Sequence, residues 1–147
     1  MELRIEDYNT ELKSQVLNVW EKSVLASHHF LTNEDFIEIK ALFNEYDFGA
    51  ITMLCLMDGE KVSGFLGLYE SKIEMLFLDP HYMGKGLGKK LIEFAVQNHR
   101  VCWVDVNEQN SNATRFYQRL GFEVFERTDK DDFGKDYPLL RMRLKEV

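Results

Sequence analysis

A glycine-rich turn that follows an apolar run is the feature of this sequence best suited to binding a ligand. Gly84, Gly86 and Gly88 stand directly before a segment with the apolar spacing of a helix. Glycine lets a backbone approach a ligand closely, and the first N–H groups of a helix have no partner within it. Such amides bind phosphate oxygens, helped by the helix dipole. Because Lys85 and Lys89 add positive charge, the turn predicts a phosphate site.

The spacing of these glycines excludes two common nucleotide-binding motifs. The P-loop requires a glycine five residues before its Gly-Lys pair, and Asp79 stands at that place before Gly84. The dinucleotide pattern Gly-x-Gly-x-x-Gly fails as well, because Lys89 and Leu91 stand where its third glycine would be. For the turn on its own, a plain connection with helix-capping glycines stays an alternative.

Side chains that could move a proton stand further along the chain. Tyr117 is a phenol with an ordinary pKa of about 10, so it is protonated at neutral pH; its helical spacing alone favours a core aromatic residue. Asp105 interrupts an apolar run and could act as a base or attract an ammonium group; the alternative is a structural carboxylate. His28 and His29 are adjacent, and no further spacing of ligand residues completes a metal site, so we expect no metal.

The elements that must position these residues follow from the periodicity of apolar side chains. Strands are predicted at 3–6, 51–57, 62–69, 73–78, 101–106, 123–127 and 139–144. Four helices are predicted at the segments that carry Leu12 to Trp20, Phe36 to Phe43, Leu87 to Ala95 and Ala113 to Leu120. The order is β-α-α-β-β-β-α-β-α-β-β, which indicates an α/β protein with a mixed sheet. The run 101–106 is expected to be central and buried on both faces, and Asp58-Gly59 to form a type I′ turn.

Composition sets the class of protein. The 147 residues include 45% hydrophobic residues and carry a net charge of −7, which suits one domain, residues 1–147, that does not bind nucleic acid. An acidic surface mildly attracts amines. Apolar runs are too short to span a membrane. Cys55 and Cys102 lie in apolar runs, which indicates reduced core thiols in a cytoplasmic protein. A monomer and a homodimer are both compatible with the sequence.

A second motif, taken with the glycine turn, resembles the two sequence signatures of the GNAT N-acetyltransferases. The signatures read Leu78-x-Pro80-x-x-x-Gly84-x-Gly86-x-Gly88 and Asn110-x-x-Ala113-x-x-Phe116-Tyr117-x-x-x-Gly121-Phe122. The resemblance covers nearly the whole chain. More narrowly, Trp20-x-x-Ser23-Val24, Ser27-His28-x-Phe30-Leu31 and the segment 131–140 resemble the small bacterial YjaB-type acetyltransferases.

The resemblance implies a GNAT acyl-CoA N-acyltransferase fold with splayed central strands and acetyl-CoA as co-substrate. It places pantetheine beside residues 76–78, the pyrophosphate on amides between Gly84 and Lys89, and Tyr117 near the CoA sulfur. The cofactor-binding residues expected from it are Leu76, Phe77, Leu78, Met83, Gly84, Lys85, Gly86, Leu87, Gly88, Lys89, Asn110 and Phe116. Met83 stands where the family usually has Arg or Gln. The acceptor-side residues expected are Trp20, His28, Phe30 and Tyr137.

The activity implied by the resemblance is transfer of an acetyl group to a primary amine by direct attack in a ternary complex, with Tyr117 and Asp105 as catalytic residues. A non-catalytic CoA-binding regulatory module and a transferase for another acyl-CoA are the alternatives. Peptide N-termini, lysine side chains, polyamines and small amines are all compatible acceptors, because a fold does not choose among them.

Overall fold

The computed structural model describes residues 2–27 and 29–145, and its elements follow the predicted order. One seven-stranded sheet has the order β1-β2-β3-β4-β5-β7-β6. Its strands are β1 (Leu3–Asp7), β2 (Thr52–Asp58), β3 (Lys61–Tyr69), β4 (Lys72–Leu78), β5 (Trp103–Asn107), β6 (Phe122–Thr128) and β7 (Leu139–Leu144). The helices are α1 (Lys13–Ser27), α2 (Asn33–Asn44), α3 (Leu87–His99) and α4 (Ser111–Arg119), with short 3-10 turns η1 (Thr10–Leu12), η2 (Phe48–Ala50) and η3 (Pro80–Tyr82). The predicted α/β class and mixed sheet are confirmed.

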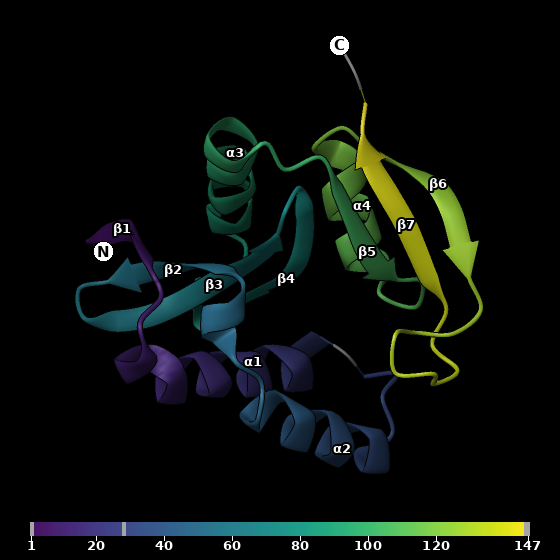
Figure 1. The fold of residues 1–147 in the computed structure, drawn as a ribbon, viewed down its shortest axis with the longest axis horizontal. Helices are drawn as coiled ribbons and strands as arrows, with labels where there is room; N and C mark the ends of the chain where they lie inside the picture. Colours follow the sequence, from purple (N-terminus) through teal and green to yellow (C-terminus); the bar gives the residue numbers. More distant parts are fainter. Residues whose placement is uncertain (1, 28, 146–147) are drawn as a thin grey trace.

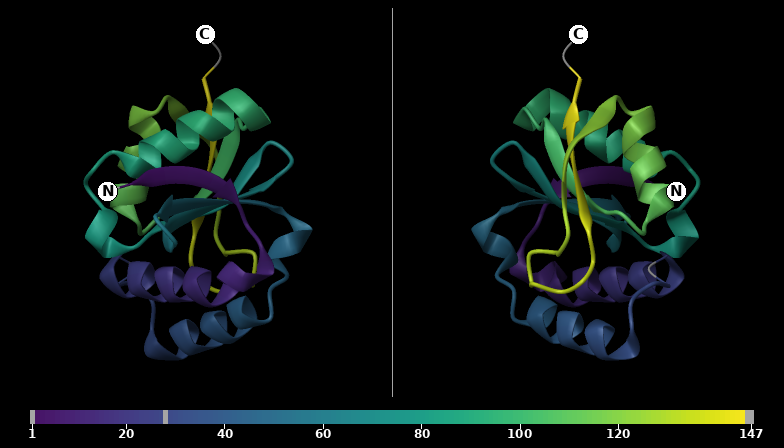
Figure 2. Two further views of the ribbon diagram at one scale, coloured as in Figure 1. Left: turned by 90° about the vertical axis from the view of Figure 1, so that its left-hand side faces the viewer. Right: turned by 90° about the vertical axis from the view of Figure 1, so that its right-hand side faces the viewer.

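The helices lie on both faces of the sheet. Helices α1 and α2 lie below β1 to β4 in Figure 1, and α3 and α4 lie on the other side. The side views in Figure 2 show the same layers, with the sheet between the two pairs of helices. Each pair therefore buries its own face of the sheet.

Strand β2 shows why both faces are buried. Its side chains alternate between the two layers, as the pleat of a strand requires. Leu54 and Leu56 join the core under α3 and α4, whereas Met53, Cys55 and Met57 join the core over α1 and α2. Strand β2 thus reads as a continuous apolar run because both of its faces are covered.

Strands β4 and β5 pair over only two residues. The parallel register joins Lys72 to Trp103 and Ile73 to Val104, and the ladder then ends. Just beyond it, β4 shifts its register against β3: Leu68 pairs with Ile73 but Gly67 pairs with Met75. Glu74 is therefore an extra residue in β4, and such a bulge bends a strand and increases its twist. The splayed central strands expected from the resemblance are confirmed.

Three local expectations are wrong. In β5, Val104 and Val106 are buried but Trp103, Asp105 and Asn107 are only partly buried, because α4 covers one face of the strand. Cys102 precedes β5 and is exposed, although Cys55 is buried as expected and burial raises the pKa of its thiol to about 12. Asp58 pairs with Lys61, so Gly59 and Glu60 are the central turn residues, and only Gly59 has positive φ.

Trp20 is a core residue rather than an acceptor-side one. It is 3% exposed and stacks on Phe36 and Phe43 of α2, at centroid distances of 5.7 and 5.0 Å. The stack joins α1 to α2, so its main contribution is to the free energy of folding.

Removing this stack should destabilise the protein without touching the ligand sites. We expect Trp20→Ala to lower the free energy of unfolding by about 3–5 kcal/mol, measured by denaturant unfolding. Leu25→Ala is the control, because Leu25 lies on the same helix and is 58% exposed; its effect should stay within about 0.5 kcal/mol. Equal effects of the two substitutions would contradict the assignment of Trp20 to the core.

Candidate active site

The glycine turn exposes a row of backbone amides at the start of α3. Gly84 and Gly86 both have φ of 75°, and a Cβ atom at either would meet no other atom within 4 Å. Glycine is therefore needed here for backbone conformation rather than for space. Gly86 is the N-cap of α3 and supplies no side-chain hydrogen bond. The first hydrogen bond of the helix runs from the Lys90 amide to the Gly86 carbonyl at 3.2 Å.

The amides of Leu87, Gly88 and Lys89 consequently donate no hydrogen bond within the described part of the chain. Unpaired N–H groups at a helix start form an anion site. The side chain of Lys85 lies over the ring of Tyr82, with Nζ 5.8 Å from the ring centroid, so a positive charge stays beside the turn. Met83 precedes the turn and is 37% exposed. Its side chain carries no charge, so this residue can contribute only its backbone to an anion site.

Gly88 brings three elements together. A Cβ atom at this position would lie 3.3 Å from the ring of Phe116 on α4 and 3.7 Å from Leu78 at the end of β4. The start of α3 thus packs closely against both neighbours, and a side chain at this position would require the Phe116 ring to shift by a few tenths of an ångström. The glycine turn, the parted end of β4 and Phe116 therefore form one corner of the molecule, as the cofactor-side prediction requires.

Tyr117 lies beside this corner in a fully apolar setting. It is 6% exposed, and its ring packs edge-on against those of Phe116 and Phe122, with ring centroids 5.0 and 5.5 Å away. Burial raises the pKa of its phenol above the ordinary value, so the group stays protonated. The hydroxyl of Tyr117 makes no hydrogen bond to another described residue. Every fully buried polar side-chain atom among those residues does have a partner, so the hydroxyl oxygen of Tyr117 is not fully buried and reaches solvent.

Asn110 stands at the N-terminus of α4 and has a structural role of its own. Its Oδ1 accepts a hydrogen bond from the Ala113 amide at 3.1 Å, which caps the helix. The cap fixes where α4 begins and therefore where Phe116 and Tyr117 lie. The side-chain contact with pantetheine that the resemblance implies stays a prediction.

The opposite face of the parted strands holds an acidic pocket of about 180 Å³. Its lining residues are Lys72, Ile73, Glu74, Asp105, Asp131, Asp132, Phe133 and Leu139. Asp105 is almost enclosed, with 9% of its side chain exposed, and forms ion pairs with Lys72 at 3.0 Å and Arg141 at 3.2 Å. Its carboxylate is thus held in a fixed position between two cations.

Asp105 is the one lining residue of this pocket that was predicted as a site residue, and Glu74, Asp131 and Asp132 are acidic lining residues that sequence reasoning missed. Glu74 shows the reason. It is the extra residue of β4, its side chain is 30% exposed, and Lys72 lies 3.6 Å away. The available signal was a lone acidic residue inside an otherwise apolar strand, the same signal that identified Asp105. The bulge that turns Glu74 toward the pocket depends on pairing with β3, which the sequence pattern did not reveal.

The remaining acceptor-side predictions lie at the edge of this pocket rather than in it. Tyr137 is 8% exposed, and its hydroxyl donates a hydrogen bond to Asp35 of α2. The ring of Phe30 packs against the ring of Tyr137, with the two ring centroids 6.0 Å apart. These two residues are therefore brought together, but neither lines the pocket. His28 lies outside the described residues.

Residues 2–27 and 29–145 contain no group of three or more His, Cys, Asp or Glu side chains placed to hold a metal ion. In the same ranges, no helix is both long enough and apolar enough to cross a membrane.

Comparison with known proteins identifies the family. Residues 17–145 match the acetyltransferase (GNAT) domain. The chain is 34% identical over 142 residues to the peptidyl-lysine N-acetyltransferase YjaB of Salmonella typhimurium, covering 97% of this chain and 98% of the relative. The solution structure of apo-form YjaB from Escherichia coli superposes with a TM-score of 0.91 at 31% identity over 100% of both chains. The PaiA N-acetyltransferase of Thermoplasma acidophilum, solved with coenzyme A, gives a TM-score of 0.74 at 24% identity and covers 99% of this chain and 100% of its own.

This chain belongs to the GNAT acetyltransferase family. It is an acetyl-CoA-dependent N-acetyltransferase. Its own residues fit that co-substrate, because the turn offers unpaired amides to a diphosphate and the ladder between β4 and β5 ends beside them. In the bound state, acetyl-CoA supplies the thioester.

The conformation of the glycine turn should control affinity for CoA. Alanine at Gly86 would have to adopt φ of 75°, which costs roughly 1–2 kcal/mol for a residue with a Cβ atom. The free turn would relax away from this conformation, and binding would have to restore it. We expect Gly86→Ala to weaken CoA binding by about tenfold, measured by titration calorimetry.

Gly121→Ala is the matched control, because Gly121 also has positive φ but follows the far end of α4. It should lower stability while leaving the dissociation constant of CoA unchanged. A wild-type affinity in Gly86→Ala would show that the turn does not hold the diphosphate.

Proposed function

We propose that this protein acetylates lysine side chains of peptides or proteins, by direct attack of the amine on acetyl-CoA in a ternary complex. Two curated relatives, at 34% and 33% identity over 142 residues each, are named peptidyl-lysine N-acetyltransferases. The supporting observation in this chain is that the ladder between β4 and β5 ends between two chemically different faces of the sheet. The glycine turn and Tyr117 lie on one face, and the acidic pocket lies on the other.

A lysine ammonium suits the acidic face. The pocket contains four carboxylates, Glu74, Asp105, Asp131 and Asp132, and one lysine. This excess of negative charge attracts a cation and favours its approach from solvent. The exposed ring of Phe133 offers an apolar surface to the methylene stem of a lysine side chain.

Before it attacks, the acceptor must lose a proton, because a free lysine amine has a pKa of about 10.4. Because Lys72 and Arg141 already engage the Asp105 carboxylate, we assign Asp105 the role of fixing the pocket wall and assign attraction of the ammonium to Glu74, Asp131 and Asp132. Glu74 is more exposed and can pass the proton to solvent. Direct attack by the amine requires no nucleophile from the protein. The buried Cys55 would be a poor nucleophile, because its thiol, with a pKa raised to about 12, stays protonated.

Tyr117 is the proposed acid for the departing thiolate. A phenol with a raised pKa keeps its proton through the working range of the enzyme, and its hydroxyl has no competing partner among the described residues. Protonation of a leaving group by a positioned side chain contributes about 10²- to 10⁴-fold to the rate. Holding the amine and thioester in line contributes further.

The acceptor class can be tested directly. Purified protein is incubated with acetyl-CoA and lysine-containing peptides with blocked N-termini, and thiol release is followed together with peptide mass. We expect acetylation on the lysine side chain. If the peptides stay unmodified while a polyamine or small amine is acetylated, the peptidyl-lysine assignment is wrong.

The role of Tyr117 predicts a separation of rate from binding. We expect Tyr117→Phe to lower kcat by about 100-fold and to leave the dissociation constant of acetyl-CoA unchanged. In the wild type, kcat/KM should rise with pH up to about 10.4, the pKa of the amine, since the amine loses its proton while the raised pKa keeps Tyr117 protonated. Tyr69→Phe is the control because Tyr69 is 54% exposed. A Tyr117→Phe enzyme as fast as the wild type would remove the acid role.

A further inference from the structure

The connection between β6 and β7, residues 129–138, reaches the start of α2, a segment about 100 residues earlier in the chain. Figure 1 shows this β6–β7 loop descending from the sheet to the N-terminal end of α2. It is also the segment that contributes Asp131, Asp132 and Phe133 to the acidic pocket. One loop therefore both lines the acceptor side and touches a helix that is outside the pocket.

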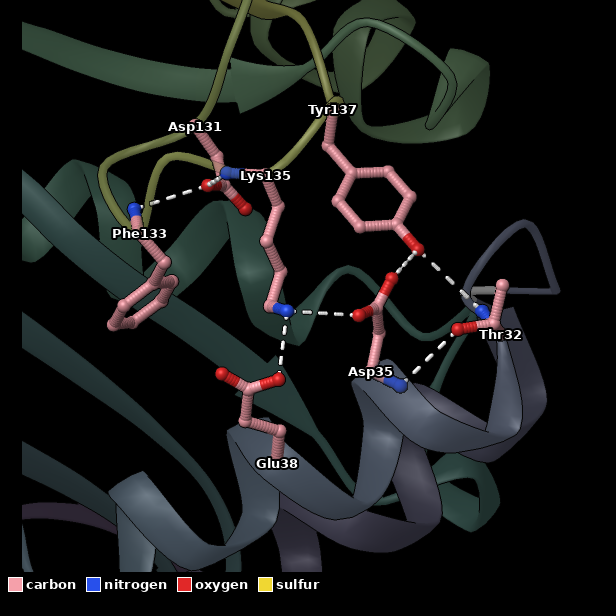
Figure 3. A network of polar contacts seen from close by, with 7 residues as sticks. All are labelled: Thr32, Asp35, Glu38, Asp131, Phe133, Lys135 and Tyr137. Carbon is pink, nitrogen blue, oxygen red and sulfur yellow. Dashed lines mark hydrogen bonds and ion pairs between the residues drawn. The ribbon is translucent and has the colours of Figure 1, made fainter.

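The pocket side of the loop is shaped by hydrogen bonds from within the loop itself. Oδ1 of Asp131 accepts hydrogen bonds from the amides of Phe133 at 3.0 Å and Lys135 at 2.9 Å. The Gly134 amide donates to the Asp131 carbonyl at 3.0 Å, and Gly134 has φ of 77°, which glycine adopts without strain. Figure 3 shows the turn closing around the Asp131 carboxylate. These bonds fix the local shape, but they do not fix where the loop lies relative to the sheet.

That placement is set by contacts with α2. Nζ of Lys135 lies 2.8 Å from Oδ1 of Asp35 and 2.8 Å from Oε2 of Glu38. The Tyr137 hydroxyl donates to the second oxygen of Asp35 and accepts from the Thr32 amide at 3.5 Å. Figure 3 shows Lys135 and Tyr137 converging on the Asp35 carboxylate from the loop.

These contacts are better shielded than ordinary surface ion pairs. The side chains of Lys135 and Asp35 are 18% and 23% exposed, and Tyr137 is 8% exposed. Lys135 and Tyr137 hold the pKa of Asp35 below its ordinary value, and the two carboxylates raise the pKa of Lys135. Lys130, in the same loop, differs: it pairs with Asp136, whose side chain is 90% exposed, and that pair does not reach α2.

We propose that Asp35, Lys135 and Tyr137 are positioning residues for the acceptor: they fasten the β6–β7 loop to α2 and so hold Asp131, Asp132 and Phe133 as a fixed wall of the acceptor pocket. The proposal rests on the proposed function, because it takes the acidic pocket as the place where the acceptor amine binds. None of the three residues lines that pocket, so their effect on the acceptor passes through the loop. Binding of the acceptor to an unfastened loop must include the entropy of ordering it.

The test is a comparison of Michaelis constants for the two substrates. We expect Lys135→Met to raise the KM for a lysine peptide by about tenfold, with little change in kcat at saturating peptide and none in the KM for acetyl-CoA. A general loss of folding would instead alter both constants and the melting temperature. Lys135→Arg retains a cation for Asp35 and Glu38, and it should restore most of the peptide affinity.

Lys130→Met is the matched control, because it removes the same charge from the same loop without breaking a contact to α2. It should leave the peptide KM near the wild-type value. Asp35→Asn combined with Lys135→Met should raise the peptide KM by less than the product of the single effects, since both remove the same ion pair.

Two outcomes overturn the proposal: a wild-type peptide KM in Lys135→Met, or an equal rise in Lys130→Met. A third outcome separates it from the acceptor assignment. If wild type does not acetylate lysine peptides, the assignment to peptidyl-lysine fails. The same comparison is then made with the amine that wild type acetylates from a panel of polyamines and amino sugars. The positioning role is supported if the KM for that amine rises in Lys135→Met but not in Lys130→Met.

Discussion

The short ladder between β4 and β5 is the constraint on which the rest of the structure depends. Two residue pairs join the strands, and an extra residue in β4 then turns it away. The gap does not open the sheet, because β4 stays paired with β3 and β5 stays paired with β7 along their lengths. The ladder between β4 and β5 thus ends between the glycine turn on one face of the sheet and the acidic pocket on the other. In the proposed ternary complex, donor and acceptor meet at this point.

The two sides of this gap have opposite electrostatic character. On the side of α3, unpaired amides and the start of a helix dipole provide positive potential in a chain whose net charge is −7. On the side of β5, carboxylates gather around Asp105, which two cations hold in place. A diphosphate and an ammonium group would each be repelled from the other's side. In the proposed ternary complex, this arrangement orders the two substrates before any chemical step.

The acceptor side is assembled from distant parts of the chain. Glu74 comes from a bulge in β4, Asp105 from β5, and Asp131 from a loop that α2 holds through Lys135. None of these segments is adjacent in sequence, and each is placed by a different contact. The anion site on the cofactor side is instead built from one turn and the helix start that directly follows it, residues 84–89. This difference in construction explains why members of one family can share a co-substrate and differ in acceptor.

The sequence by itself determined the order of elements, the glycine turn before α3 with its free amides, and the placing of Tyr117 on a helix beside Phe116. These features depend on spacing and on the conformational freedom of single residues, which are local properties. Only the tertiary structure decided that Trp20 is a core residue, that Tyr137 binds Asp35, and that Glu74 lines the pocket. Burial and cross-strand register arise from contacts between residues far apart in the chain, and a linear pattern does not encode which partner each side chain meets.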